Sequence, residues 1–322
     1  MSASRFRFAL ATLGALALLA VMPACDNSVE RTIPDPEARP DGWELVWSDD
    51  FDGDALDLSK WEYQIGDGCA EGICGWGNGE FQNYAEDNLS VGDGTLSITA
   101  RQTIADDDTS YTSSRIRTLG QGDWTYGRFE IRAKLPTGQG LWPAIWLLFS
   151  EDTYGNWASS GEIDIMESIG SAPGEVFGTL HYGGEFPGNV FGGEPFNLFS
   201  GTFADDFFVF TTDWIEAIPD DPATEDVDEF QPTTIRWYVN NVLYQTQTEA
   251  DWFSEGAPEG NTAAPFDHAF HMILNVAVGG NLPGAPSPDT FFPQTMEVDY
   301  VRVYEWTGEG QPPASGIEGS GA

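Results

Sequence analysis

Three acidic side chains occur within six residues of the octapeptide Gly-Glu-Ile-Asp-Ile-Met-Glu-Ser, whose remaining residues suit a β-strand. Successive side chains of a strand point to opposite faces, so Glu162 and Asp164 share one face. Strict alternation would place Glu167 on the other face. One bulged residue near Ile165 or Met166 restores the parity and brings all three carboxyls together.

Three carboxyls spread over roughly 10–15 Å of strand repel one another. Such crowding holds one carboxyl protonated near neutral pH while another stays ionised. A protonated acid beside an ionised carboxylate is the equipment for hydrolysing a glycosidic bond. A solvated edge strand with acidic residues on its wet face is the alternative that the octapeptide alone leaves open.

An aromatic segment precedes these acids, with the sequence Leu-Trp-Pro-Ala-Ile-Trp-Leu-Leu-Phe over residues 141–149. On a strand, Trp142, Ala144 and Trp146 share one face. Two indoles on a wet face suit stacking against sugar rings, whereas two indoles on the other face would pack in a core.

Together these segments resemble the active-site region of glycoside hydrolase family 16. The Glu-x-Asp-x-x-Glu spacing, with its extra residue in the second gap, is similar to that of the laminarinase-like members. In that family the first Glu is the nucleophile, the last is the acid/base and the Asp assists the nucleophile. The resemblance therefore implies these roles for Glu162, Glu167 and Asp164, in a retaining double displacement.

Further blocks resemble the family in the same order along the chain. They are Glu80–Tyr84, Gly94–Ala100, Ser114–Ile116, Tyr126–Glu130, Leu274–Asn281 and Val298–Tyr304. The resemblance implies an all-β fold, a concanavalin-like jelly-roll sandwich of two curved antiparallel sheets with a concave substrate cleft. The matching sugar contacts are Asn83, Arg115, Trp142, Trp146, Trp157 and His181. A core role for His181 and a carboxylate partner for Arg115 are the alternatives.

The resemblance also implies a structural calcium ion, although the chemistry requires no cofactor. The matching ligands are the side chain of Asp299 and the carbonyls of Asp50 and Gly94. Hard oxygen ligands of this kind suit calcium. The alternative is that Asp299 pairs with Arg302 or caps a turn.

The strand pattern agrees with an all-β class without reference to any family. Between Trp43 and Trp306, short β-rich runs are broken by Gly, Pro, Asn and Asp, and we find no convincing amphipathic helix. The expected strands include Glu44–Trp47, Thr95–Ala100, Arg128–Ala133, Trp142–Phe149, Phe207–Trp214, Thr234–Tyr238, His271–Val276 and Glu297–Tyr304. Residues 43–306 are expected to form one catalytic β-sandwich domain.

The charge of the chain limits its partners. There are 52 acidic and 13 basic residues, giving a formal net charge of −39. This charge excludes nucleic acid and anionic membrane surfaces as electrostatic partners, and it disfavours sulfated polysaccharides. A hydrophobic content of 41% is still enough for a large core.

The first 25 residues have the charged start and short apolar run of a secretory signal, too short for a permanent membrane helix. The Ala24-Cys25 end resembles a bacterial lipoprotein signal, in which Cys25 would carry the lipid. We therefore expect export, either to the cell envelope through this lipid anchor or by ordinary cleavage to the extracellular space. Residues 26–42 are expected to be a flexible tether and residues 307–322 a disordered tail.

Three loops carry further expectations. Cys69 and Cys74 lie in a Gly-rich segment and are expected to form a disulfide in an oxidising compartment, because two thiols without a nearby His pair make a poor zinc site. Residues 216–231 form an expected acidic, exposed insertion that lacks the spacing of a twelve-residue calcium loop. The Gly- and Phe-rich segment 183–203 is expected to be a loop that could wall the cleft.

The sequence thus favours an endo-acting β-1,3-glucanase whose partner is a β-glucan polysaccharide and which acts as a monomer. The same fold acting on mixed-linkage glucan, or on a galactan such as agarose or carrageenan, remains open because a fold does not determine the substrate. A non-catalytic glucan-binding module would not need the intact carboxylates. A lectin-like structural sandwich would not need a crowded acidic strand beside tryptophans.

Overall fold

The computed structural model describes residues 41–106, 108–219, 230–315 and 317–318. The expected signal 1–25 with Cys25, the tether up to residue 40 and the centre of the acidic insertion lie outside these residues. In the described part, no helix has the length and apolar character needed to cross a membrane.

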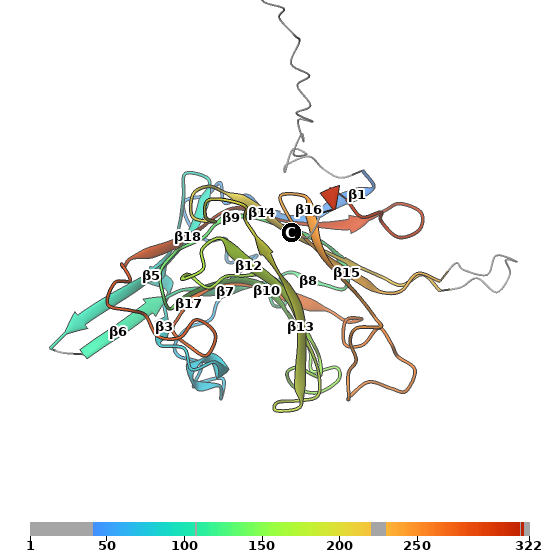
Figure 1. Ribbon diagram of the computed structural model, residues 1–322, viewed down its shortest axis with the longest axis horizontal. Helices are drawn as coiled ribbons and strands as arrows, with labels where there is room; N and C mark the ends of the chain where they lie inside the picture. Colours follow the sequence, from blue (N-terminus) through green and yellow to red (C-terminus); the bar gives the residue numbers. More distant parts are fainter. Residues whose placement is uncertain (1–40, 107, 220–229, 316, 319–322) are drawn as a thin grey trace, which may run out of the picture. The chain divides into compact units, whose positions relative to one another are not determined.

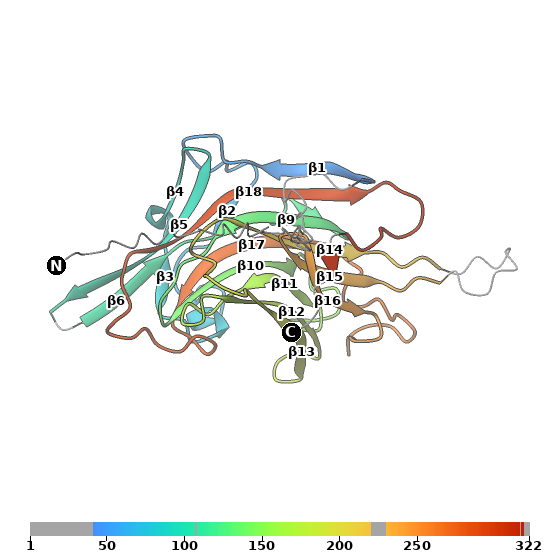
Figure 2. The same ribbon diagram turned by 45° about the horizontal axis from the view of Figure 1, so that its top comes forward.

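Two packed β-sheets make up the described residues (Figures 1 and 2). The larger sheet has the order β19-β16-β15-β14-β9-β18-β5-β6-β3, with β1 beside β18 and β4 beside β5. Its strands are β1 (Trp43–Asp49), β3 (Gln82–Tyr84), β4 (Leu89–Gly92), β5 (Thr95–Ala105), β6 (Asp108–Ser113), β9 (Gly127–Lys134), β14 (Phe208–Ile215), β15 (Thr234–Val239), β16 (Val242–Thr248), β18 (Gln294–Trp306) and β19 (Ile317–Glu318).

The smaller sheet has the order β13-β12-β11-β10-β17-β7-β2, with β8 beside β17. Its strands are β2 (Glu62–Tyr63), β7 (Arg115–Arg117), β8 (Asp123–Trp124), β10 (Leu141–Phe149), β11 (Glu162–Glu167), β12 (Glu175–Gly183), β13 (Asn189–Asn197) and β17 (Phe270–Val278). All of its strand pairs are antiparallel within the described residues.

Alternation along the strands builds the core between the sheets. On β10, Leu141, Ile145 and Leu147 are fully or almost fully buried in this core, while Trp142 and Trp146 point to the opposite face and stay partly exposed. We call that opposite face of the smaller sheet the cleft face. At roughly 25 cal/mol per Å² of apolar surface, burial of such side chains is the main force that holds the two sheets together.

The all-β sandwich expected from the sequence is confirmed. Each of the eight expected runs coincides with an observed strand. Helical structure in the described residues is limited to two 3₁₀ turns, η1 (Cys74–Gly77) and η2 (Glu86–Asn88). Segment 183–203 differs from the expected loop because its centre forms β13, which pairs with β12 at nine positions.

The C-terminal segment also differs from the expected disordered tail. The amide of Gln311 donates hydrogen bonds to the backbone oxygens of Glu216 (2.7 Å) and Pro232 (2.8 Å). Further along, the Ser315 hydroxyl accepts one from Arg128 (2.9 Å), a residue with no exposed surface. Composition indicated disorder, but these side chain contacts hold residues 307–315 against the larger sheet.

Two of the predicted loop features lie partly or wholly in the described residues. Cys69 and Cys74 are joined by a disulfide. Ile218 and Gln231 form an isolated antiparallel bridge at the base of the acidic insertion, whose centre is not described.

Candidate active site

A β-bulge places the three acidic residues of β11 on the cleft face. Trp146 is paired with Asp164, but its neighbour Ile145 is paired with Met166, so Ile165 has no partner on β10. The extra residue corrects the alternation in the way expected from the sequence. Ile165 and Met166 both enter the core, and Glu167 emerges on the same face as Asp164.

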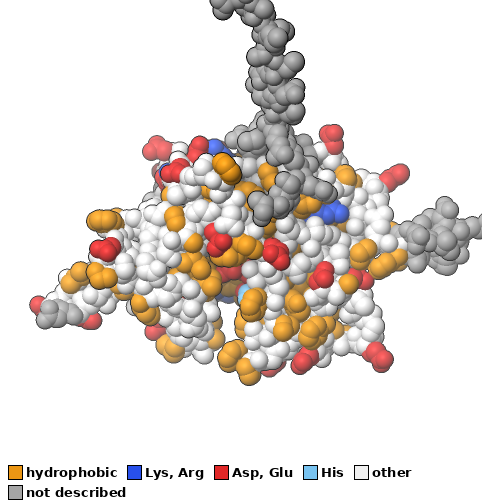
Figure 3. Space-filling model, in the orientation of Figure 1, with side chains coloured by type: hydrophobic (Ala, Val, Ile, Leu, Met, Phe, Trp, Pro, Cys, Tyr) orange, Lys and Arg blue, Asp and Glu red, His pale blue; other side chains and the backbone are white. Residues whose placement is uncertain are grey.

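In the space-filling view, a hollow bordered by hydrophobic side chains contains acidic side chains and a histidine (Figure 3). Within the site, each outer carboxylate accepts a hydrogen bond from its own indole. Nε1 of Trp142 donates to Glu167 (2.9 Å), and Nε1 of Trp157 donates to Glu162 (2.9 Å). The two glutamates are therefore held separately, one from β10 and the other from the loop before β11.

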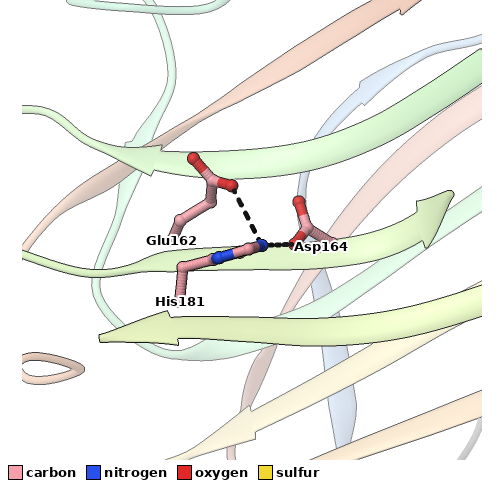
Figure 4. Close-up of side chains that lie close together, drawn as sticks. All are labelled: Glu162, Asp164 and His181. Atoms are coloured by element: carbon pink, nitrogen blue, oxygen red, sulfur yellow. Dashed lines mark ion pairs between the residues drawn. The ribbon is translucent and has the colours of Figure 1, made fainter. Parts of the chain in front are cut away.

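His181 on β12 lies beside Glu162 and Asp164 (Figure 4). Its Nε2 is 3.3 Å from Oδ2 of Asp164 and 3.6 Å from Oε1 of Glu162. Burial opposes a charge on this imidazole, but Asp164, Glu162 and Glu167 together outweigh it and raise the pKa of His181 to about 9. The imidazole is therefore positively charged at neutral pH.

Burial and the nearby charge of Asp164 raise the pKa of both glutamates. Burial, followed by the charge of Asp164, raises the pKa of Glu162 to about 7. The same two causes raise the pKa of Glu167 to about 8. Both carboxyls therefore hold a proton more tightly than a free glutamic acid does, so one of them can stay protonated near neutral pH while the other ionises. An acid and a nucleophile need different protonation states of this kind.

Within the described residues, Glu162, Asp164 and His181 also form a group whose potential metal-ligand atoms lie within 4.8 Å of one another. Charge balance explains the proximity of these three residues without a metal ion. The positive imidazolium near the two carboxylates balances charge in a buried site. We interpret this group as part of the catalytic apparatus.

A second cluster lines the cleft face beyond β10. Nε1 of Trp146 donates to Oδ1 of Asn275 (2.8 Å). The guanidinium of Arg115 stacks over the rings of Trp76 (4.3 Å) and Trp146 (4.9 Å), and its Nε donates to Oε1 of Gln64 (2.6 Å). Arg115 is therefore fixed by aromatic stacking and an amide. This cluster forms a polar and aromatic wall beside the carboxylates.

Residues 78–218 match the family model described as glycosyl hydrolases family 16. A β-glucanase from Rhodothermus marinus is 41% identical over 280 residues, which cover 82% of this chain and 86% of that protein. The chain belongs to glycosyl hydrolases family 16.

Two further proteins are similar, one in sequence and one in structure. The glucan endo-1,3-β-glucosidase A1 of Niallia circulans is 41% identical over 276 residues, covering 82% of this chain but only 38% of that longer protein. The X-ray structure of an endo-β-1,3-glucanase from Pyrococcus furiosus superposes with a TM-score of 0.69 at 37% identity, covering 83% of this chain and 96% of that one.

Among the residues matched to family 16 sugar contacts, Asn83 does not join the site. It is exposed on β3 between two buried residues, Gln82 and Tyr84, so its side chain lies on the opposite face of the strand from theirs. The amide side chain that contacts Trp146 on the cleft face belongs to Asn275 instead. The other matched residues, Arg115, Trp142, Trp146, Trp157 and His181, all lie around the carboxylates or in the adjoining wall.

The sequence reasoning also missed Glu80 as part of the wall. Its carboxylate accepts hydrogen bonds from Gln82 (2.6 Å) and from the hydroxyl of Tyr84 (3.1 Å), and burial raises its pKa. Tyr84 in turn accepts from Nδ2 of Asn275 (3.1 Å), which links Glu80 to Trp146. The sequence held a signal for Asn275 but none for Glu80, because Asn275 is the one polar residue in the run 272–278, and a polar group in an apolar strand needs a partner.

The residues matched to the family's calcium ligands lie close together along one edge of β18. This edge pairs with β5 before Asp299 and with β1 after it, so Asp50 and Gly94 both flank Asp299. Oδ2 of Asp299 accepts a hydrogen bond from Arg132 (2.5 Å), and Arg302 binds the side chain of Asp50 (2.7 Å). The carbonyls of Asp50 and Gly94 and the second oxygen of Asp299 are hard oxygen donors, the type of ligand that calcium prefers.

Proposed function

We propose that this family 16 protein is an endo-acting β-1,3-glucanase that cleaves laminarin-type glucan with retention of configuration. The observation that carries the proposal is the pair of separately held glutamates on one face of β11, both with raised pKa values. The names of the Niallia circulans and Pyrococcus furiosus relatives support the β-1,3 linkage.

The reaction follows from this geometry in two steps. The carboxylic acid of Glu167 gives its proton to the glycosidic oxygen while the carboxylate of Glu162 attacks the anomeric carbon. The bond to the leaving sugar breaks, and a covalent glycosyl-enzyme forms. Glu167, now ionised, takes a proton from water, whose oxygen displaces Glu162 and restores both groups. Such enzymes hold their carboxyls about 5–5.5 Å apart.

The two neighbours of the nucleophile have electrostatic roles in this proposal. Asp164 keeps the pKa values of both glutamates high, so that a proton is available at Glu167. His181 carries a positive charge near Glu162 and keeps that carboxylate ionised enough to attack. Neither residue exchanges a proton with the substrate.

A neutral glucan is the substrate that the cleft fits best. The flat indoles of the cleft suit sugar rings, and the net charge of −39 repels sulfate esters. Arg115, the cation in the wall, is already stacked between two indoles. Mixed-linkage β-glucan and neutral agarose are the alternatives, because the same carboxylates would act on them.

A structural calcium ion is a further part of the proposal. It would be held by the side chain of Asp299 and the carbonyls of Asp50 and Gly94, and its effect would be on stability, because this edge of β18 belongs to the larger sheet. The fit of the hard oxygen donors supports it.

The substrate assignment can be tested by incubating the purified enzyme with laminarin, lichenan, agarose and carrageenan. We expect short β-1,3 oligosaccharides from laminarin and slower cleavage of lichenan, with retained β configuration of the first products by NMR. Release of reducing ends from agarose but not from laminarin would overturn the substrate. Initial α products would overturn the mechanism.

The roles of the glutamates can be separated with leaving groups. Glu167→Gln should lower kcat/KM on laminarin by about 10²–10⁴-fold, but kcat/KM much less on an aryl glucoside, because this parameter reports the first step and a phenolate leaves without a proton. Glu162→Gln should be inactive on both. Equal losses for Glu167→Gln on the two substrates would contradict its role as the acid.

A further inference from the structure

A row of directly paired residues crosses the cleft face away from the Arg115 wall. Glu162 on β11 is paired with His181 on β12, and His181 is paired with Phe191 on β13. Directly paired residues share a face, so all three side chains lie on the cleft face. The ring of His181 lies 5.5 Å from that of Trp157 and 5.9 Å from that of Phe191.

Phe191 is unusual for its position because it is 71% exposed on the edge strand of the smaller sheet. Edge strands usually carry charges or proline, which discourage pairing with other chains. The next residues of β13 on the same face are Gly193 and Pro195, so no large side chain of this strand covers the ring from that direction. A single exposed ring carries no meaning by itself, but this one lies against His181 of the candidate active site and continues its row of aromatic rings.

The distances place Phe191 beyond the reacting sugar. Adjacent strands are about 4.8 Å apart, so Phe191 starts roughly 10 Å from Glu162 across the sheet. A chain lying across β11 would therefore pass over His181 and reach the phenyl ring. The ring offers no hydrogen bond, only a flat apolar face that matches the C–H face of a β-linked pyranose.

We propose that Trp157, His181 and Phe191 form an aromatic shelf on which Phe191 stacks a glucosyl unit beyond the scissile bond, on the β13 side of the cleft. The proposal rests on the proposed function and adds a specificity-determining residue to it. Figure 3 shows hydrophobic side chains gathered beside the histidine at the hollow. A glucan chain too short to reach Phe191 gains no binding energy from the shelf, whereas a longer glucan chain does.

The dependence on chain length provides the test. We would measure kcat/KM for a series of β-1,3-gluco-oligosaccharides and for laminarin with the wild type, Phe191→Ala and Phe191→Trp. Phe191→Ala should lower kcat/KM about two- to tenfold on the long substrates through a higher KM. It should leave the shortest cleaved substrate unaffected, and Phe191→Trp should restore the long-chain advantage.

Phe199→Ala is the matched control, because Phe199 is fully exposed and follows the opposite end of β13. It should behave as the wild type at every length, and melting temperatures of all variants should agree. A loss for Phe191→Ala that is equal at all lengths, or no loss, would overturn the shelf while the glucanase stands. A wild type that cleaves no glucan would overturn the proposed function and the shelf with it.

Discussion

Nε2 of His181 lies 3.3 Å from Oδ2 of Asp164, a carboxylate that is only 3% exposed. The two charges act on the glutamates in opposite directions. Asp164 raises the pKa of both Glu162 and Glu167, and His181 lowers both. The pH range of activity is thus set by this ion pair as well as by the groups that react.

Removing the charge of His181 should move the acid limb of the pH profile. In His181→Gln, the pKa of Glu162 rises above its value of about 7 because the nearby positive charge is lost. Glu162 must be ionised to attack, so the rise of kcat/KM should shift to higher pH. Asp164→Asn should shift both limbs to lower pH, because the pKa of each glutamate falls.

The control for this profile is His271→Gln. Burial lowers the pKa of His271 to about 3, so the substitution removes no charge at working pH. The pH profile of kcat/KM for His271→Gln should coincide with that of the wild type between pH 5 and 10. A His181→Gln enzyme with an unmoved acid limb would show that the imidazole does not act on Glu162 electrostatically.

The two indole hydrogen bonds should control different limbs of the same profile. Trp142→Phe keeps an aromatic ring but removes the donor to Glu167, so the pKa of Glu167 rises and the alkaline limb moves to higher pH. Trp157→Phe removes the donor to Glu162, so the acid limb moves to higher pH instead. Identical profiles for the two variants would mean that these indoles serve stacking alone.

Chelation should lower the thermal stability of the enzyme if calcium binds beside β18. A ligand at 100 times its Kd stabilises the folded state by about 2.7 kcal/mol, so calcium should raise the melting temperature of chelated protein. Asp299→Ala should abolish this response. Asp50→Asn should retain it, because the Asp50 ligand would be a backbone carbonyl. A melting temperature that changes with neither chelator nor added calcium would exclude the ion.

Reduction of the Cys69–Cys74 disulfide should weaken substrate binding more than folding. The closed loop is short, so its loss should lower the free energy of unfolding by only about 2–3 kcal/mol. Trp76 lies two residues after Cys74, and its ring stacks against Arg115. We therefore expect a Cys69→Ser/Cys74→Ser enzyme to fold, by denaturant titration, with a raised KM. Native protein that is alkylated without reduction would contradict the disulfide itself.

The sequence was sufficient to place the carboxylates because their position depends on local alternation and one bulge. It was also sufficient for Trp142 and Trp146 on β10, whose side chains follow the same alternation. Trp157 is different, since it lies in a loop and its hydrogen bond to Glu162 depends on the path of that loop.

Where several faces were available, the sequence alone was insufficient. The choice between Asn83 and Asn275 depends on which face of two distant strands meets the cleft, and only the sheet register decides it. Residues 307–315 have the composition of a free tail, yet specific contacts from Gln311 and to Ser315 fix them. Such contacts involve residues far apart in the chain, and local composition does not record them.

The bulge at Ile165 has a consequence for changes in chain length. Deleting that single codon would leave Glu-x-Asp-x-Glu, in which plain alternation still presents all three carboxyls on one face. An inserted residue beside Ile165, or a deletion between Glu162 and Asp164, would instead turn a carboxylate into the core. This strand can therefore shorten in one place without losing the order of its acidic residues, and that place is the bulge.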